Sequence, residues 1–192
     1  MPPAEHTGWF SIPGVHEQAE RTLEDQLLGL EAALASCAGK TVLDLGCAEA
    51  MISREFAKAG ASRVVGIETA DWSVELAKVV CGGFKVVEII HANLNDYMRR
   101  NAVPEKFDIV LALGIVHKLP DMEAGLRWSA SCAKSLYLLR PPGYAGQDGW
   151  FRNKRDTHRV HAPTVLKDEG FCETSRVSGA HNEHVEYWRR VS

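Results

Sequence analysis

The stretch Thr41-Val-Leu-Asp-Leu-Gly-Cys-Ala-Glu-Ala50 is a short aliphatic run followed by a loop of small and acidic residues. The run predicts a buried strand over residues 41–45. Periodic apolar residues then predict a helix over about 51–59. Ligands of open α/β sheets bind beyond the carboxyl ends of the strands. The loop of residues 44–50 is therefore the expected ligand site.

The same alternation of strand and helix continues on the carboxyl side of this loop. We expect strands over 63–67, 84–90, 107–113 and 135–139, helices over 71–80 and 121–132, and a short irregular or helical piece over 96–101. Parallel neighbours need crossover connections, and helices then cover both faces of the sheet. The predicted fold class is α/β, a doubly wound and mostly parallel sheet.

The two ends of the chain depart from this alternation. Apolar residues three or four apart predict one amphipathic helix over 17–36, and residues 1–36 form an N-terminal extension packed on a single unit of residues 37–192. After a long, irregular stretch over 140–161, we expect a helix over 164–169 and a hairpin of strands 171–178 and 185–190.

Composition places limits on the location and the partners of the protein. The 192 residues are 45% hydrophobic and carry a net charge of -3, which argues against a protein that coats nucleic acid. An apolar run long enough to cross a bilayer is missing, and the first residues do not resemble a secretory signal, so we expect a cytoplasmic location. The five cysteines are expected to be reduced thiols.

Two carboxylates decide which ligand suits the loop. Of the glycines of a dinucleotide fingerprint only Gly46 is present, while Asp44 would repel a pyrophosphate and attract an ammonium or sulfonium group. Asp44 could instead only brace the turn. Glu68 ends the next predicted strand, about 20 residues beyond the loop, where a carboxylate accepts hydrogen bonds from ribose hydroxyls.

Four segments together resemble the successive motifs of class I S-adenosylmethionine-dependent methyltransferases. They are Val42-Leu-Asp-Leu-Gly-Cys-Ala-Glu-Ala50, Val65-Gly-Ile-Glu68, His91-Ala-Asn-Leu94 and Phe107-Asp-Ile-Val-Leu-Ala-Leu-Gly-Ile-Val-His-Lys-Leu-Pro-Asp121. The resemblance implies S-adenosylmethionine as the cofactor and a seven-stranded sheet whose last strand is antiparallel.

The resemblance also implies a set of cofactor-binding residues. They are Asp44, Gly46, Cys47 and Ala48 for the methionine part, Glu68 for the ribose, Thr69, Asn93 and Leu94 for the adenine, and Leu113 and Gly114 for the floor. The family usually has glycine at positions 48 and 50 and aspartate at position 93. The amide oxygen of Asn93 could still accept from the adenine amino group.

The acceptor side of the site is less well defined by the sequence. His117 is the candidate general base, although a histidine in this motif could simply pack under the cofactor. The predicted substrate-binding residues are Arg140 and, from the basic and aromatic segment 150–161, Trp150, Arg152 and Arg155. The segment could also be a solvated loop. The histidine pairs 158/161 and 181/184 do not form a convincing ligand set, so no metal is expected.

Three functions remain open at this stage. The favoured one is a methyltransferase acting on a small molecule, with a tRNA-type RNA methyltransferase that uses segment 150–161 as its alternative. The other two are an NAD(P)-dependent oxidoreductase and a cofactor-binding regulator without catalysis.

Overall fold

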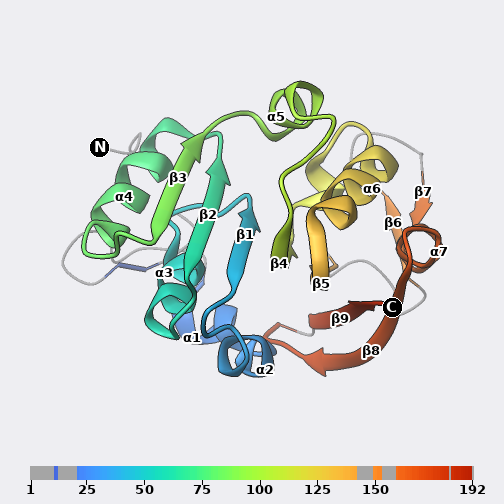
Figure 1. Ribbon diagram of the computed structural model, residues 1–192, viewed down its shortest axis with the longest axis horizontal. Helices are drawn as coiled ribbons and strands as arrows, with labels where there is room; N and C mark the ends of the chain where they lie inside the picture. The colour runs from blue at the N-terminus through green and yellow to red at the C-terminus, as the bar shows by residue number, and fades with distance from the viewer. Residues whose placement is uncertain (1–10, 13–20, 142–148, 153–158, 182, 192) are drawn as a thin grey trace.

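The protein is built on a seven-stranded sheet with the strand order β3-β2-β1-β4-β5-β9-β8 (Figure 1). The computed structural model describes residues 11–12, 21–141, 149–152, 159–181 and 183–191. The strands are β1 (Thr41–Leu45), β2 (Arg63–Glu68), β3 (Val87–His91), β4 (Phe107–Leu113), β5 (Ala133–Arg140), β8 (Phe171–Ser178) and β9 (His184–Arg190). Strands β1 to β5 pair in parallel, whereas β9 is antiparallel to both β5 and β8. The predicted fold class, including the antiparallel last strand, is confirmed.

Helices cover both faces of the sheet (Figure 1). They are α1 (Leu23–Leu27), α2 (Glu31–Ala35), α3 (Met51–Lys58), α4 (Asp71–Cys81), α5 (Leu94–Arg100), α6 (Met122–Cys132) and α7 (Ala162–Asp168), with a 3₁₀ turn η1 (Val116–Lys118). Neighbouring strand residues point to opposite faces. Leu43 accordingly packs in a cluster with α6 and α7, and Val42 packs in a second cluster with α2 and α3.

The predicted N-terminal helix over 17–36 is wrong as a continuous element. Residues 17–20 lie outside the described part of the chain, and the rest forms α1 and α2 with a break at Leu28 and Gly29. Gly29 has φ +84°, and a Cβ on it would lie 3.0 Å from Val185 Cγ2. The break is therefore set by close packing against β9, which the local periodicity does not report.

The sequence predicts an irregular stretch over 140–161, but residues 150–152 and 159–161 within it form two strands. Residues of β6 (Trp150–Arg152) pair with β7 (Arg159–His161) in a separate antiparallel ribbon. Phe151 and Val160 face each other across it and are buried in the cluster that contains α6 and α7. The ribbon is thus fixed to the domain by its inner face.

The strand predicted over 84–90 starts too early in the sequence, because β3 begins at Val87.

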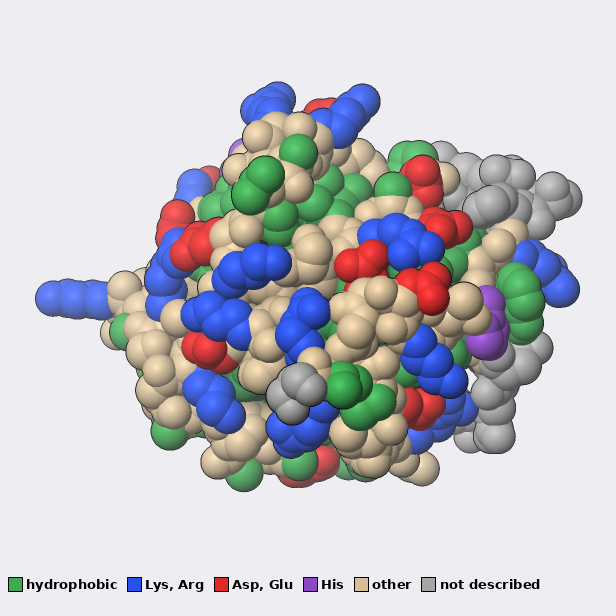
Figure 2. Space-filling view, turned by 45° about the vertical axis from the view of Figure 1, so that its right-hand side comes forward, with side chains coloured by type: hydrophobic (Ala, Val, Ile, Leu, Met, Phe, Trp, Pro, Cys, Tyr) green, Lys and Arg blue, Asp and Glu red, His purple; other side chains and the backbone are tan. Residues whose placement is uncertain are grey.

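The surface drawn in Figure 2 carries both basic and acidic side chains. Several Lys and Arg side chains lie near one another in the middle of this view, and acidic side chains are interspersed with basic ones toward its right side. This mixture agrees with the small net charge of -3.

Candidate functional site

A cavity of about 480 Å³ opens at the carboxyl ends of β1, β2, β4 and β5. All ten residues that the sequence assigned to the cofactor line it, together with His117 and Arg140. Nine further residues line it that the sequence did not indicate: Arg21, Gln26, Ile52, Asn95, Ile115, Lys118, Leu119, Pro141 and Glu183. The motif residues come from four separate segments, and the topology of the sheet brings them to one edge.

The loop after β1 turns sharply because several of its residues adopt the left-handed backbone conformation. Gly46 has φ +71°, Ala48 +49° and Ala50 +56°. A Cβ on Gly46 would lie 2.9 Å from Ile115 Cδ1, so this position needs glycine for space as well as for φ. An alanine pays about 1–2 kcal/mol for the left-handed conformation. The two positions that depart from the usual glycines are therefore strained.

The side chain of Cys47, in the loop after β1, packs against the neighbouring strand β2. A Cβ on Gly66, in the middle of β2, would lie 2.7 Å from Cys47 Sγ. The thiol is buried beside Cys81 and Ala50, and burial raises its pKa well above the usual value. Glycine at position 66 therefore lets the loop lie directly on the sheet.

Asp44 is a buried carboxylate at the end of β1. The residue is only 3% exposed, and Ser53 Oγ donates a hydrogen bond to Asp44 Oδ2 at 2.6 Å. The pKa of Asp44 is raised to about 6: burial is the largest cause, the nearby Glu68 charge acts in the same direction, and the Ser53 hydrogen bond acts against both. Among the described residues no cationic side chain pairs with Asp44, so its carboxylate would gain from a cation in a ligand.

Glu68 at the end of β2 holds the neighbouring backbone. Its Oε2 accepts from Ala48 N at 3.0 Å, and its Oε1 accepts from Thr69 N at 2.7 Å and Ala70 N at 2.9 Å. One carboxylate therefore fixes both the loop after β1 and the start of α4. A carboxylate can accept about four hydrogen bonds, which leaves some capacity for a ligand hydroxyl.

Asn93 and Leu94 lie at one end of the cavity, at the start of α5. Asn93 is the N-cap, and its Oδ1 accepts from Asn95 N at 3.0 Å and Asp96 N at 3.4 Å. Asn93 Oδ1, which the sequence analysis assigned to the adenine amino group, is engaged in capping the helix. The amide NH₂ is therefore the group of Asn93 that remains for a ligand.

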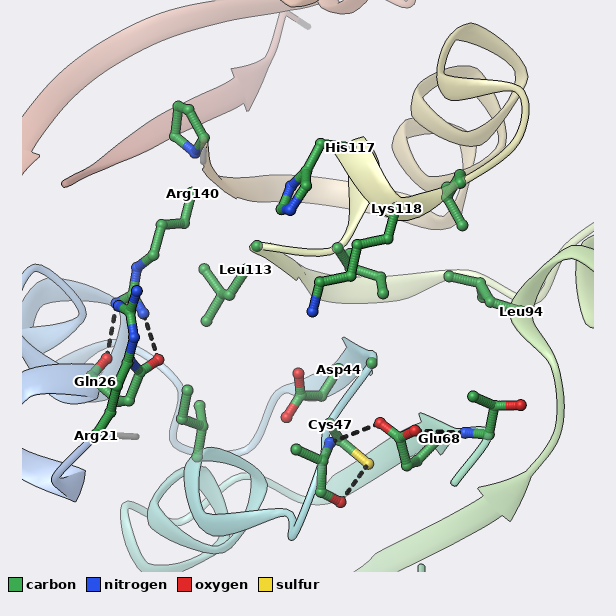
Figure 3. Close-up of a pocket in the computed structure, with 18 of the residues that line it drawn as sticks. Arg21, Gln26, Asp44, Cys47, Glu68, Leu94, Leu113, His117, Lys118 and Arg140 are labelled. Carbon is green, nitrogen blue, oxygen red and sulfur yellow. Dashed lines mark hydrogen bonds between the residues drawn. The ribbon is translucent and has the colours of Figure 1, made fainter. Parts of the chain in front are cut away.

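The wall above the loop comes from β4 and the turn that follows it. Leu113 ends β4, Gly114 has φ +70°, and His117 and Lys118 belong to η1. Figure 3 shows the side chains of His117 and Lys118 projecting into the cavity, opposite Asp44 and Cys47. A titratable imidazole therefore faces the same space as the loop.

The other end of the cavity is formed by residues far apart in the sequence. Arg21 donates to both carboxylate oxygens of Glu183 at 2.7 Å, and Arg140 donates to Gln26 Oε1 at 2.7 Å. Figure 3 places Arg21, Gln26 and Arg140 together at the end opposite Leu94. The N-terminal segment thus closes this end against β5 and the β8–β9 turn.

The remaining predicted substrate residues lie elsewhere or are not described. Trp150, 44% exposed, and Arg152 belong to β6 and do not line the cavity, and Arg155 lies outside the described residues. Trp150 instead stacks near His161 across the ribbon, with ring centroids 5.0 Å apart. Whether either residue contacts a substrate stays a prediction.

The described residues lack both a metal-binding cluster and a membrane-spanning helix. They contain no group of three or more His, Cys, Asp or Glu side chains arranged to hold a metal ion. Within that same part of the chain, none of the helices is both long and apolar enough to span a membrane.

Comparison with known proteins gives a consistent family. A family model described as a methyltransferase domain matches residues 36–190. A ubiquinone biosynthesis O-methyltransferase of Neisseria meningitidis is 32% identical over 109 residues, which are 57% of this chain and 43% of that protein. The 27-O-demethylrifamycin SV methyltransferase of Amycolatopsis mediterranei is 29% identical over 138 residues, 72% of this chain and 47% of that protein. The matches thus span less than half the length of these curated relatives.

Solved structures show the same fold. The magnesium protoporphyrin IX methyltransferase of Synechocystis, solved with bound SAM, superposes with a TM-score of 0.66 at 19% identity. The alignment covers 87% of this chain and 77% of that one.

Proposed function

Because the chain belongs to the methyltransferase domain family, we propose that it transfers a methyl group from S-adenosylmethionine to a small molecule. The family resemblance carried by the four sequence motifs is confirmed by the match over residues 36–190. The assignment of individual residues to parts of the cofactor belongs to the proposal.

One observation carries the proposal: residues from four separate motifs line a single cavity, in an order that suits this cofactor. Along the cavity, Leu94 lies at one end, Glu68 follows, and Asp44 comes next (Figure 3). We assign adenine to the first position, ribose to the second and the methionine part to the third. The buried carboxylate of Asp44 suits a cationic ammonium or sulfonium group. A Cβ on Gly46 would lie 2.9 Å from Ile115 Cδ1, so glycine lets the loop pack closely against the turn after β4.

The cofactor, when bound, supplies an electrophilic methyl group on a sulfonium. Methyl transfer of this kind needs mainly that donor and acceptor be held in line. The loop after β1 and Glu68 would hold the donor, while the wall formed by Leu113, Gly114 and His117 would face the acceptor. His117 is the candidate to receive a proton when the acceptor is a hydroxyl.

A small acceptor is supported by the relatives and by the shape of the site. The names of both relatives refer to small molecules: one names ubiquinone biosynthesis, and the other names 27-O-demethylrifamycin SV. The cavity of about 480 Å³ must hold the cofactor as well as the reacting part of the acceptor. The RNA alternative depended on segment 150–161, and its residues Trp150 and Arg152 are not among the lining residues.

The test has two stages. Adenosylhomocysteine should raise the melting temperature of the protein, and NAD or NADP should leave it unchanged. Labelled S-adenosylmethionine is then incubated with the protein and with extract separated into RNA, protein and small-molecule fractions. Label in the small-molecule fraction supports the proposal. Label confined to RNA would contradict the choice of acceptor, and stabilisation by NAD alone would contradict the cofactor.

A further inference from the structure

Arg140 is a buried cation whose hydrogen-bond partners are all neutral. The residue is 5% exposed and ends β5. Its Nη1 donates to Gln26 Oε1 at 2.7 Å, and its Nη2 donates to the carbonyl oxygens of Gln26 at 2.7 Å and Leu28 at 3.4 Å. In the described ranges of the chain, Arg140 makes no ion pair, and its Nε has no hydrogen-bond partner.

A buried charge without a counterion is unfavourable, and such charges are normally paired. Glu183, an acidic residue that also lines the cavity, is bound through both oxygens to Arg21. Burial accordingly lowers the pKa of Arg140, and Glu183 offsets this only in part. The described part of the protein therefore supplies no anion that pairs directly with Arg140.

The position of Arg140 indicates where that anion would come from. Arg140 and Gln26 line the cavity at the end opposite Leu94, beyond Asp44 (Figure 3). The cavity is therefore acidic at Asp44 and Glu68 and cationic at Arg140. A ligand that places a cation over Asp44 and an anion beyond it would match both ends.

We propose that Arg140 binds a carboxylate group of a ligand at this end of the cavity, with Gln26 orienting the guanidinium. This inference rests on the proposed function, which supplies two sources for the group: the amino-acid end of the cofactor or a carboxylate of the methyl acceptor. Arg is suited to the task because its planar donors match carboxylate geometry.

Arg140 also has a structural role that the test must separate. Its bonds to the carbonyls of Gln26 and Leu28 tie the end of α1 to β5. Tyr187 ties the same turn independently, because its hydroxyl donates to Gly29 O at 2.7 Å, and Tyr187 does not line the cavity. Tyr187→Phe is therefore a matched control that loosens α1 without changing the charge of the cavity.

The first arm measures the binding of two compounds related to the cofactor by calorimetry. Adenosylhomocysteine carries the amino-acid end, and 5′-methylthioadenosine lacks it. If the carboxylate is that of the cofactor, Arg140→Gln weakens adenosylhomocysteine by about tenfold to a hundredfold and leaves methylthioadenosine unchanged. Arg140→Lys, which keeps the charge, recovers part of the affinity, and Tyr187→Phe changes neither ligand. Binding of methylthioadenosine also reports that each variant is folded.

The second arm uses benzoate as a probe for an acceptor carboxylate, titrated into protein saturated with adenosylhomocysteine. If the group is that of the acceptor, wild type binds benzoate, Arg140→Gln does not, and both adenosylhomocysteine and methylthioadenosine bind the variant normally. The inference is wrong if Arg140→Gln weakens adenosylhomocysteine and methylthioadenosine equally, or if it changes neither their binding nor that of benzoate. A wild-type protein that binds no adenosylhomocysteine would instead contradict the proposed function.

Discussion

Replacing Asp44 by asparagine should make the ligand-free protein less sensitive to pH. The pKa of Asp44 is about 6 in the folded protein against an ordinary value of 3.8. Because the folded-state pKa is the higher one, the folded state binds the proton more tightly. The carboxyl group therefore favours folding below about pH 3.8 and opposes it increasingly as the pH rises through 6.

The size of the effect follows from the two pKa values. A difference of about two pK units corresponds to about 3 kcal/mol between the acidic and the neutral limit. About half of this, on the order of 1.5 kcal/mol, falls between pH 5 and pH 8. The asparagine keeps an oxygen that can accept from Ser53 Oγ, which lies 2.6 Å from Asp44 Oδ2. The hydrogen bond therefore survives while the charge is removed.

The assay is urea unfolding of wild type and Asp44→Asn at pH 5 and pH 8 without cofactor. The difference in unfolding free energy between the two proteins should shift by about 1.5 kcal/mol in favour of the variant at pH 8. Ser53→Ala serves as a control, because loss of its hydrogen bond should raise the pKa of Asp44 further and steepen the dependence. A constant loss of stability at both pH values would refute the reasoning and show that Asp44 only braces the turn. Asp44→Asn should also bind S-adenosylmethionine more weakly than wild type does. Its loss of affinity for S-adenosylmethionine should exceed its loss of affinity for adenosylhomocysteine, because adenosylhomocysteine lacks the sulfonium charge.

Four further predictions follow from the site. Ala50→Gly should stabilise the protein by about 0.5 kcal/mol in urea unfolding, since relief of φ +56° exceeds the added chain entropy. Gly66→Ala should destabilise it by about 1–3 kcal/mol in the same assay, and Cys47→Ala in the same chain should recover part of this. Asn93→Asp should keep the cap of α5, leave the melting temperature equal or higher, and strengthen adenosylhomocysteine binding measured by calorimetry. His117→Gln should lower kcat for a hydroxyl acceptor by about a hundredfold with unchanged affinity for adenosylhomocysteine; an equal loss of affinity would show that His117 packs under the cofactor.

Local patterns predicted those parts of the fold that local interactions determine. The aliphatic runs gave β1 and β4, and the helix predicted over 121–132 begins at an aspartate, a residue type whose side chain accepts hydrogen bonds from the first turn of a helix. In the structure, Asp121 Oδ1 accepts from Ala124 N at 2.9 Å. The break at Gly29 was missed because its cause is Val185, which lies in another part of the chain.

The same distinction applies to the site. Asp44 and Glu68 could be placed from sequence because both end neighbouring parallel strands, whose carboxyl ends meet at one edge. The contacts between Arg21 and Glu183 and between Gln26 and Arg140 join residues 162 and 114 positions apart. No pattern of spacing or charge in the sequence indicates such pairs. Arg140 was selected as a substrate residue for its charge, but its burial and its neutral partners appear only in three dimensions.

Three residues that break local rules lie in the cavity or in the loop that borders it. Asp44 is an acid held in a buried place, Ala50 is an alanine at positive φ, and Arg140 is a buried cation without an ion pair in the described chain. Each lowers the stability of the ligand-free protein, and folded proteins tolerate such features mainly at functional sites. A ligand with a cation near Asp44 and an anion near Arg140 would remove two of these penalties together. Binding should therefore stabilise the protein more than its contacts elsewhere imply, and the Asp44→Asn and Arg140→Gln variants should each show a smaller ligand-induced rise in melting temperature than wild type.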